Sequence, residues 1–340
     1  MFNFENCQDF AVVGNGTIDG MGYVWWVAVL EGKLQHGRPN LLQLTSGRNV
    51  TLAGITLRNS PQFHVHWGDL MGAEIYSVHV LVDVVGQRAL LDKYGALHPE
   101  IPIPIFPLNT DGLDVTGSNI HIHDCVVENF DDSVCIKACN MGNNLSKCSE
   151  NILVERIEQR LGVGMSIGSV GPSTQISCVR NVTFRDITFQ APIKAIYIKT
   201  DPGTDGSGII ENITYENCVV HDPVWWAIYI GPQQMKEPDH SGPGCMFYPV
   251  GPCETQPLIT IRSVTLRNVT VNNGLLFPGI LRCNASNPCE DFVFDDVVVS
   301  DWDIGKSEGF ICEYVNGTAR NSRPSPQCLT QVSAQPPKPG

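Results

Sequence analysis

A short motif that returns roughly every 30 residues constrains the fold of this chain more than any other feature. An asparagine followed by Ile or Val and then by alternating apolar residues begins at Asn119, Asn151, Asn181 and Asn212, at intervals of 32, 30 and 31 residues. Turn residues bound the apolar runs, which is typical of short strands and not of helices. The period is also too short for a strand–helix–strand unit in every repeat.

Each repeat has room for about three short strands. After the motif at Asn181, for example, further alternating runs follow at 185–189 and 195–199. One such coil cannot bury its inward side chains alone, but stacked coils share a continuous core. An asparagine at a fixed corner tolerates left-handed backbone and can hydrogen-bond its copy in the next coil. We therefore predict an all-β fold, a right-handed parallel β-helix (solenoid).

The repeats predict one domain over residues 1–322. Two interruptions, near 84–108 and 231–257, are expected to be long loops inserted between coils, which commonly wall a binding groove. The Pro-rich tail at 323–340 is expected to be loose. The first residues lack the basic and apolar regions of a signal peptide, so we expect the leader and first coils of the domain to be missing. No apolar run approaches the length of a membrane span.

The 13 cysteines follow no C-x-x-C metal pattern and indicate disulfides. Three close pairs are the best candidates: Cys245 with Cys253, Cys283 with Cys289, and Cys312 with Cys328. Three others lie in apolar strand contexts and are expected to be buried thiols: Cys7, Cys125 and Cys218. Eight Asn-x-Ser/Thr sequons occur, of which some are expected to carry glycans: Asn15, Asn49, Asn144, Asn181, Asn212, Asn268, Asn284 and Asn316. These features predict an extracellular (secreted) glycoprotein.

Net charge limits the classes of partner. The chain carries 22 basic and 35 acidic residues, a formal charge of −13, which argues against nucleic acid or an anionic membrane as partner. A polyanionic substrate would require positive charge to be concentrated locally.

Three aspartates are predicted to form the chemical centre. Asp111 precedes a glycine, and Asp131-Asp132 follows twenty residues later, just before the strand at 133–137. On adjacent coils these carboxylates lie on one face, about 5 Å apart along the axis, and their repulsion raises at least one pKa. A protonated acid beside an ionised base is the pair that glycoside hydrolysis requires. An Asp-Gly or an Asp-Asp sequence alone more often marks a turn. The position of both on one face of the helix favours a catalytic site.

Four motifs in this order and spacing resemble the polygalacturonase family of pectin-degrading glycoside hydrolases, and the resemblance covers nearly the whole chain. The motifs are Asn109-Thr110-Asp111-Gly112, Asp131-Asp132, the stretch 162–169 and Tyr197-Ile198-Lys199. The resemblance implies Asp131 as general acid, Asp111 and Asp132 as joint activators of water, and inversion at the anomeric carbon. It also implies that Asn109 orients the site and that Lys199 contacts the substrate carboxylate. A monomer acting on pectic polysaccharide without a cofactor is expected.

Two positions depart from the family pattern. Val163 stands where the third motif normally has histidine, and Tyr197 stands where the fourth normally has arginine. Valine can neither carry charge nor donate a hydrogen bond, and tyrosine lacks the forked donor of arginine, although its ring and hydroxyl can contact a sugar. The rhamnogalacturonan-cleaving branch also lacks both residues, but its carboxylate motifs usually differ from those of this chain. Both substrates therefore remain open.

A few other residues are candidates for sugar or metal binding. Trp225 and Trp226 cannot both point inward on a strand, and we select Trp226 as a sugar contact. His121 and His123 alternate on one strand, and such a pair can bind zinc, but no third ligand at metal spacing follows them, so no metal is predicted.

Two further classes of function remain as alternatives. The first is a lyase on the same kind of helix, in which the clustered aspartates would hold calcium. The second is a catalytically weak, sugar-binding relative, for which Val163 and Tyr197 argue.

Overall fold

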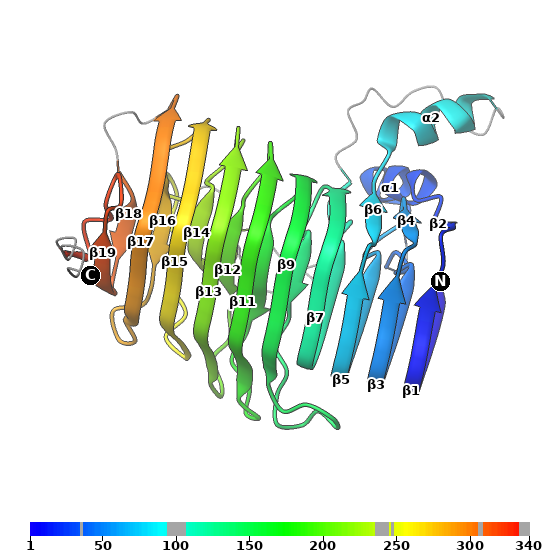
Figure 1. Cartoon of the computed structure of the whole chain (residues 1–340), viewed down its shortest axis with the longest axis horizontal. Helices are drawn as coiled ribbons and strands as arrows, with labels where there is room; N and C mark the ends of the chain where they lie inside the picture. Colours follow the sequence, from blue (N-terminus) through cyan, green and yellow to red (C-terminus); the bar gives the residue numbers. More distant parts are fainter. Residues whose placement is uncertain (35–36, 94–106, 235–244, 246–247, 305–308, 333–340) are drawn as a thin grey trace, which may run out of the picture.

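The computed structural model describes residues 1–34, 37–93, 107–234, 245, 248–304 and 309–332. Within them a single sheet of twenty strands winds along the chain, and two helices lie beside its N-terminal coils (Figure 1). The elements are β1 (Phe2–Val13), β2 (Thr17–Asp19), α1 (Tyr23–Leu30), β3 (Leu42–Ala53), β4 (Thr56–Arg58), β5 (Val65–Tyr76), β6 (His79–Leu81), α2 (Val84–Lys93), β7 (Leu113–Asn129), β8 (Val134–Ile136), β9 (Ser149–Leu161), β10 (Met165–Val170), β11 (Ser177–Gln190), β12 (Ile196–Thr200), β13 (Gly208–His221), β14 (Ile228–Pro232), β15 (Ile259–Gly274), β16 (Gly279–Arg282), β17 (Cys289–Trp302), β18 (Ile311–Glu313), β19 (Val315–Arg320) and β20 (Thr330–Gln331).

Every coil lies in parallel register on the next. Figure 1 shows the long strands from β1 to β17 side by side and pointing in one direction, with the chain termini at opposite ends of the stack. Equivalent positions therefore form rows, one of which runs through Ile157, Ile187, Cys218, Val269 and Val297. The predicted right-handed parallel β-helix is confirmed.

The repeated asparagines form the corners of the coils. Asn151 and Asn181 have φ angles of 55° and 52°, the left-handed region in which asparagine costs less than most residues. The side-chain amide of Asn181 donates to Oδ1 of Asn151 across 3.1 Å, and Asn212 donates to Asn181 in the same way. The predicted asparagine ladder is therefore present. Each long strand passes through such corners, so strands expected to be separate are continuous.

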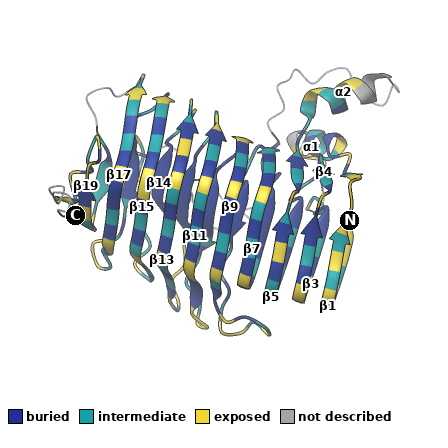
Figure 2. Ribbon diagram, viewed as in Figure 1, coloured by how far each residue is buried: buried dark blue, intermediate teal, exposed yellow. Residues whose placement is uncertain are grey.

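Alternation within each strand places the apolar side chains inside. Figure 2 shows bands of buried and exposed residues that line up from strand to strand. Aromatic rings stack in the same way, as Phe184 on Tyr215 with ring centroids 4.7 Å apart and planes 9° from parallel. Because burial of a large apolar side chain contributes about 1.5–3 kcal/mol, these inward rows supply the main stabilising term.

Two helices were not expected from the sequence. In α1, Tyr23 and Trp26 pack against Val82, and the indole Nε1 of Trp26 donates to the carbonyl oxygen of Ser60 across 3.2 Å. Helix α2 occupies the first ten residues of the insertion predicted at 84–108, in place of a loop. The rest of that insertion up to 106, and residues 235–244 and 246–247 of the second one, lie outside the described residues.

The start of the C-terminal tail is anchored, which corrects the expectation that residues from 323 onward are loose. The backbone N–H of Arg323 donates to Val297 across 2.8 Å, and β20 pairs with β19. The disulfide between Cys312 and Cys328 holds the same segment. Proline-rich composition indicated a loose chain, but the covalent link and the strand pairing outweigh it. Residues 333–340 lie outside the described residues.

All three predicted disulfides are present. A fourth, between Cys148 and Cys178, joins two consecutive coils. Cys7, Cys125 and Cys218 are free as predicted, although Cys7 is only partly buried, and Cys135 and Cys139 are free as well. Neither described helix has the length and apolarity needed to cross a membrane.

Candidate active site

The predicted site residues lie along one stack of short strands. The start of β7 and the strands β8, β10 and β12 pair in register at Leu113, Val134, Met165 and Ile196. Asp111 lies two residues before the first of these positions and Asp132 two residues before the second. Stacking therefore brings the two motifs together, as the repeat predicted.

The three aspartates converge. One carboxylate oxygen from each of Asp111, Asp131 and Asp132 lies within 4.8 Å of the others. Asp131 is half-buried, whereas Asp111 and Asp132 are 2% and 0% exposed. Backbone N–H groups hold Asp131: Asn109 donates to Oδ2 across 2.8 Å and Asp132 to Oδ1 across 2.9 Å. Asp131 is thus the member of the cluster that a substrate can reach most directly.

Asp132 is held in its ionised form. Lys199 donates from Nζ to Oδ2 across 2.7 Å, and Ser166 donates from Oγ to Oδ1 across 2.6 Å. Lys137 lies 4.0 Å from the same Oδ2. Burial acts to raise the pKa of Asp132, but Lys199 and Lys137 outweigh it, so the pKa lies below its usual value.

The other two carboxyls shift in the opposite direction. Burial and the charge of Asp132 raise the pKa of Asp131, although Lys199 and the two backbone donors oppose the shift. Burial raises the pKa of Asp111 well above its usual value, and the neighbouring aspartates, first among them Asp114, add to the effect. The cluster therefore combines two carboxyls with raised pKa values and one whose pKa is lowered.

Asp114 is a site residue that sequence reasoning missed. Its side chain is fully buried, and its Oδ2 lies 3.4 Å from Nζ of Lys137. Burial raises the pKa of Asp114 to about 7, against the opposing effect of Lys137. The signal in the sequence was an aspartate between two apolar strand residues, Leu113 and Val115, three positions after Asp111.

Lys194 is a second missed residue. It is 6% exposed, and its Nζ lies 4.7 Å from the ring centroid of Tyr197. Among the described residues, no hydrogen bond or ion pair forms to its ammonium group. Burial, with the nearby Lys199, lowers its pKa to about 8, while Asp132 and Asp131 act to raise it. A buried cation beside the carboxylates is thus available to an anionic ligand.

Arg38 supports the start of the first motif. It donates to the carbonyl oxygen of Leu108 across 2.7 Å and to Oδ1 of Asn109 across 3.0 Å. Asn109 has a φ of 58°, and its backbone N–H donates to Oδ2 of Asp131. The backbone N–H of Asn109 therefore contacts Asp131, and its side chain faces Arg38.

The imidazole of His64 hydrogen-bonds to the backbone of Asp111. Ser60 N–H donates to Nε2 of His64, so Nδ1 carries the proton and donates to the carbonyl oxygen of Asp111 across 2.9 Å. Burial lowers the pKa of His64 to about 4, so the ring is neutral at the pH of most assays.

The two rings predicted to contact sugar are largely buried in the structure. Trp226 is 4% exposed and packs against Tyr229 and Phe277, so one of the paired tryptophans is buried as expected, but it is the one selected to contact sugar. Tyr197 is also 4% exposed, and its hydroxyl accepts a hydrogen bond from Gln234 N–H. Its ring instead lies within 4.7 Å and 5.1 Å of the ammonium groups of Lys194 and Lys199.

A cavity of about 460 Å³ lies beside the C-terminal end of β12. Thr200 and Asp201, which directly follow Lys199, form part of its wall, and Gln233, Glu254 and Gln256 line it from later segments. The described lining contains two acidic residues and no lysine or arginine. The cavity therefore begins one residue after Lys199 in the chain, and its described lining carries acidic but no basic side chains.

Comparison with known proteins identifies relatives along almost the whole chain. The profile of glycosyl hydrolases family 28 matches residues 1–323. A polygalacturonase from Chamaecyparis obtusa is 30% identical over 221 residues, which cover 63% of this chain and 37% of that protein. A probable rhamnogalacturonase A from Aspergillus niger is 29% identical over 224 residues, covering 65% and 41%. The chain thus spans less than half the length of these curated relatives.

A solved structure supports the fold. The polygalacturonase from Erwinia carotovora ssp. carotovora superposes with a TM-score of 0.68 at 22% identity, covering 93% of this chain and 72% of that one. Because the identity is only 22%, this similarity shows that the two chains share the β-helix fold and nothing further.

Proposed function

This chain belongs to family 28 of the glycosyl hydrolases, and we propose that it hydrolyses glycosidic bonds in a galacturonate-containing pectic polysaccharide. The opposite pKa shifts of the adjacent Asp131 and Asp132 carry this proposal. Two neighbouring carboxyls with different protonation states are the requirement for acid and base catalysis at one glycosidic bond.

Asp131 is proposed as the general acid. Its pKa is raised, and it is the least buried of the three aspartates, so a protonated Asp131 can reach the leaving oxygen. Asp111 also has a raised pKa, but it is 2% exposed. Exposure therefore favours Asp131 over Asp111 for contact with the leaving group.

Asp132 is proposed as the ionised base that activates water. Lys199 and Lys137 keep its pKa low despite complete burial, so it holds negative charge when Asp131 is protonated. Asp111, whose carboxyl lies within 4.8 Å of both, helps to position the water. This division refines the joint role expected for Asp111 and Asp132.

Inversion is the proposed stereochemical course because the family resemblance implies it. The carboxyl groups of typical inverting pairs lie about 6.5–9.5 Å apart to leave room for water, whereas here the nearest oxygens of all three aspartates lie within 4.8 Å. With three carboxyls in place of two, water can bind against Asp111 and Asp132 while Asp131 faces the leaving oxygen. Product stereochemistry is therefore a direct test.

Lys194 and Lys199 are proposed to bind the substrate carboxylate. Lys199 already neutralises Asp132, whereas Lys194 forms no ion pair within the described part of the chain and lies over the face of Tyr197. A hydrogen bond to a charged group contributes about 1.5–3 kcal/mol. Lys194 thus supplies the positive charge that arginine would have supplied at position 197.

Rhamnogalacturonan is the second candidate substrate, and the cavity beyond β12 favours it. Glu254 lines that cavity and no lysine or arginine appears among its described lining residues, so a galacturonate carboxylate would meet like charge there. A neutral sugar next to the galacturonate at the cleavage point would avoid this repulsion. The relative named probable rhamnogalacturonase A is consistent with such a substrate.

A calcium-dependent lyase is disfavoured by the contacts of Asp132. Both of its oxygens already accept hydrogen bonds, from Ser166 and Lys199, so a cation bound by the aspartate cluster would have to displace an ammonium group. The complete carboxylate cluster equally favours catalysis over sugar binding alone. The four disulfides agree with an oxidising, extracellular setting, and glycosylation stays a prediction.

Reducing-sugar release from polygalacturonate and from rhamnogalacturonan tests the proposal. We expect release from one of them by the wild-type chain and a loss of about 10²- to 10⁴-fold in kcat for Asp131→Asn. Asp131→Asn should retain activity on a galacturonosyl fluoride, whose leaving group needs no proton, while Asp132→Asn should not. Absence of release from both polysaccharides would exclude the hydrolase, and ultraviolet-absorbing products lost on chelation would identify a lyase.

A further inference from the structure

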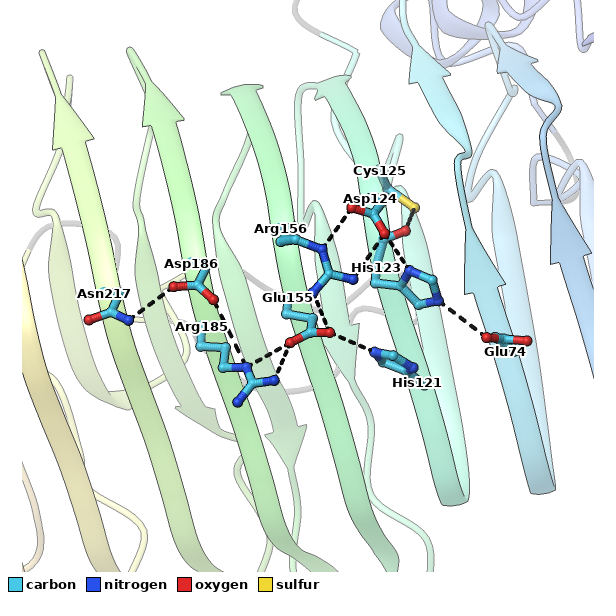
Figure 3. A network of polar contacts seen from close by, with 10 residues as sticks. All are labelled: Glu74, His121, His123, Asp124, Cys125, Glu155, Arg156, Arg185, Asp186 and Asn217. Atoms are coloured by element: carbon cyan, nitrogen blue, oxygen red, sulfur yellow. Dashed lines mark hydrogen bonds and ion pairs between the residues drawn. The ribbon is translucent and has the colours of Figure 1, made fainter.

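A second cluster of ligand-type side chains lies on another face of the helix, away from the strand stack that carries the catalytic aspartates. Figure 3 shows Glu74 of β5 and His121 and His123 of β7 projecting from the same side of neighbouring strands. One ligand atom from each of the three residues lies within 4.8 Å of the others. The corner at Asn119 separates the two histidines from Asp111 along the chain.

The register of the coils produces this convergence. His121 and His123 are two residues apart on β7, so both point to one face, and their ring centroids lie 4.1 Å apart. Glu74 pairs in register with His121, and its Oε1 lies 3.3 Å from Nε2 of His123. Two ligands at 2.0–2.2 Å from a tetrahedral zinc ion would be separated by about 3.4 Å, so this pair already has the required spacing.

The two imidazoles are held by a surrounding shell of carboxylates. Nδ1 of His123 lies 2.6 Å from Oδ2 of Asp124, and Nε2 of His121 lies 3.1 Å from Oε1 of Glu155. Such carboxylate partners on the second ring nitrogen fix the orientation of metal-binding histidines and raise their basicity. Figure 3 draws these contacts, which leave Nε2 of His123 facing Glu74.

Two arginines hold the carboxylates of Asp124 and Glu155 in place. Arg156 donates to both oxygens of Asp124, across 2.8 Å and 2.9 Å, and Arg185 donates to Glu155 across 2.6 Å. The ring of His123 also stacks on Tyr76, with centroids 5.3 Å apart and planes 7° from parallel. These contacts hold both imidazole rings in place. Glu74 remains accessible to solvent, with a side chain that is 51% exposed.

We propose that Glu74, His121 and His123 form a zinc site that joins the coil of β5 to the coil of β7, with water as the fourth ligand. Nε2 of His123 and Oε1 of Glu74 face one another across 3.3 Å, which is close to the separation of two ligands on one tetrahedral zinc ion. Because the site spans two coils, occupancy stabilises their stacking.

Calorimetric titration of the full chain with Zn²⁺ alone tests this site. We expect one ion per chain, at least a tenfold loss of affinity in Glu74→Gln and in His123→Asn, and a higher Tm with zinc only where binding is retained. Asp124→Asn should weaken binding by about 10- to 100-fold, as expected for a partner of a metal-binding histidine.

Two further variants make the outcomes decisive. His221→Asn on β13 removes a histidine outside the cluster and should leave affinity unchanged. Asp131→Asn, in the other carboxylate cluster, should also leave it unchanged. Co²⁺ should give the intense visible absorption of a tetrahedral site, and circular dichroism should confirm that each variant is folded. Lack of binding, or equal affinity in a folded His121→Asn, His123→Asn double variant, would overturn the proposal.

Discussion

Lys199 donates from Nζ to Oδ2 of Asp132 across 2.7 Å, joining two residues that lie 67 positions apart in the sequence. Asp132 is fully buried, yet this contact and Lys137 hold its pKa below the usual value. Asp131, one residue earlier, has a raised pKa from burial and from the charge of Asp132. Two adjacent aspartates thus have pKa values shifted in opposite directions.

Replacement of Lys199 by methionine should shift the acidic limb of the pH–rate profile. Without the ammonium group, burial of Asp132 is no longer compensated as fully, so its pKa rises and the base is protonated over a wider pH range. We expect the acidic limb of kcat/KM to move to higher pH and kcat at its optimum to fall at least tenfold. An exposed lysine, in Lys147→Met, provides the control, and an unmoved acidic limb in Lys199→Met would contradict the assignment.

Replacement of Lys194 by methionine should weaken substrate binding more than catalysis. The lost contact to a substrate carboxylate is worth about 1.5–3 kcal/mol, so KM for polygalacturonate should rise about 10- to 100-fold with a smaller change in kcat. Methyl-esterified substrate, which has no charge at that position, should show little difference between wild type and variant. Equal effects on both substrates would assign Lys194 a purely structural role.

The same lysine predicts a basic limit for binding. The pKa of Lys194 is lowered to about 8 by burial, so its positive charge is present below that pH and is lost above it. KM of the wild-type chain should therefore rise as the pH passes through about 8, whereas KM of Lys194→Met should show no such inflection. Initial rates on oligogalacturonates over pH 6–10 measure this difference.

Asp114 should make the folded state less stable as pH rises. Burial raises its pKa to about 7 in the folded chain, against about 3.9 when unfolded. Between these values the folded state holds a proton that the unfolded state has released, so stability is full at low pH and is lost as pH approaches 7. In Asp114→Asn the fall in Tm from pH 4 to 7 should be smaller by roughly 2–6 °C. The exposed Asp301, as Asp301→Asn, is the control, and an equal slope in Asp114→Asn would contradict the prediction.

Proton NMR of the first product should reveal inversion. Hydrolysis by direct attack of water yields the anomer opposite to the substrate linkage, before mutarotation mixes the two forms. We expect the β-anomer from an α-linked galacturonan. An α-anomer as first product would indicate a covalent intermediate, for which the close spacing of the aspartates, within 4.8 Å, would then be the structural reason.

The repeat made the fold predictable because every coil must turn at the same corner positions and bury its inward apolar side chains against the next coil. Asparagine corners such as Asn181 recur with the strand pattern, and parallel stacking follows from inward apolar rows. Helix α1 was missed because its eight residues are almost all apolar and lack periodicity. The anchored start of the tail was missed because the pairing of β20 with β19 joins segments whose local composition indicates a loose chain.

The sequence by itself determined the coil period, the three close disulfides and the clustering of Asp111, Asp131 and Asp132, because these follow from local spacing. Tertiary structure decided burial and charge pairing, which depend on what the neighbouring coil presents. It buried Trp226, raised the pKa of Asp114, and left Lys194 without an ion pair among the described residues. It also brought Glu74 to His121 and His123, a third ligand that spacing along the strand could not reveal because it comes from the preceding coil.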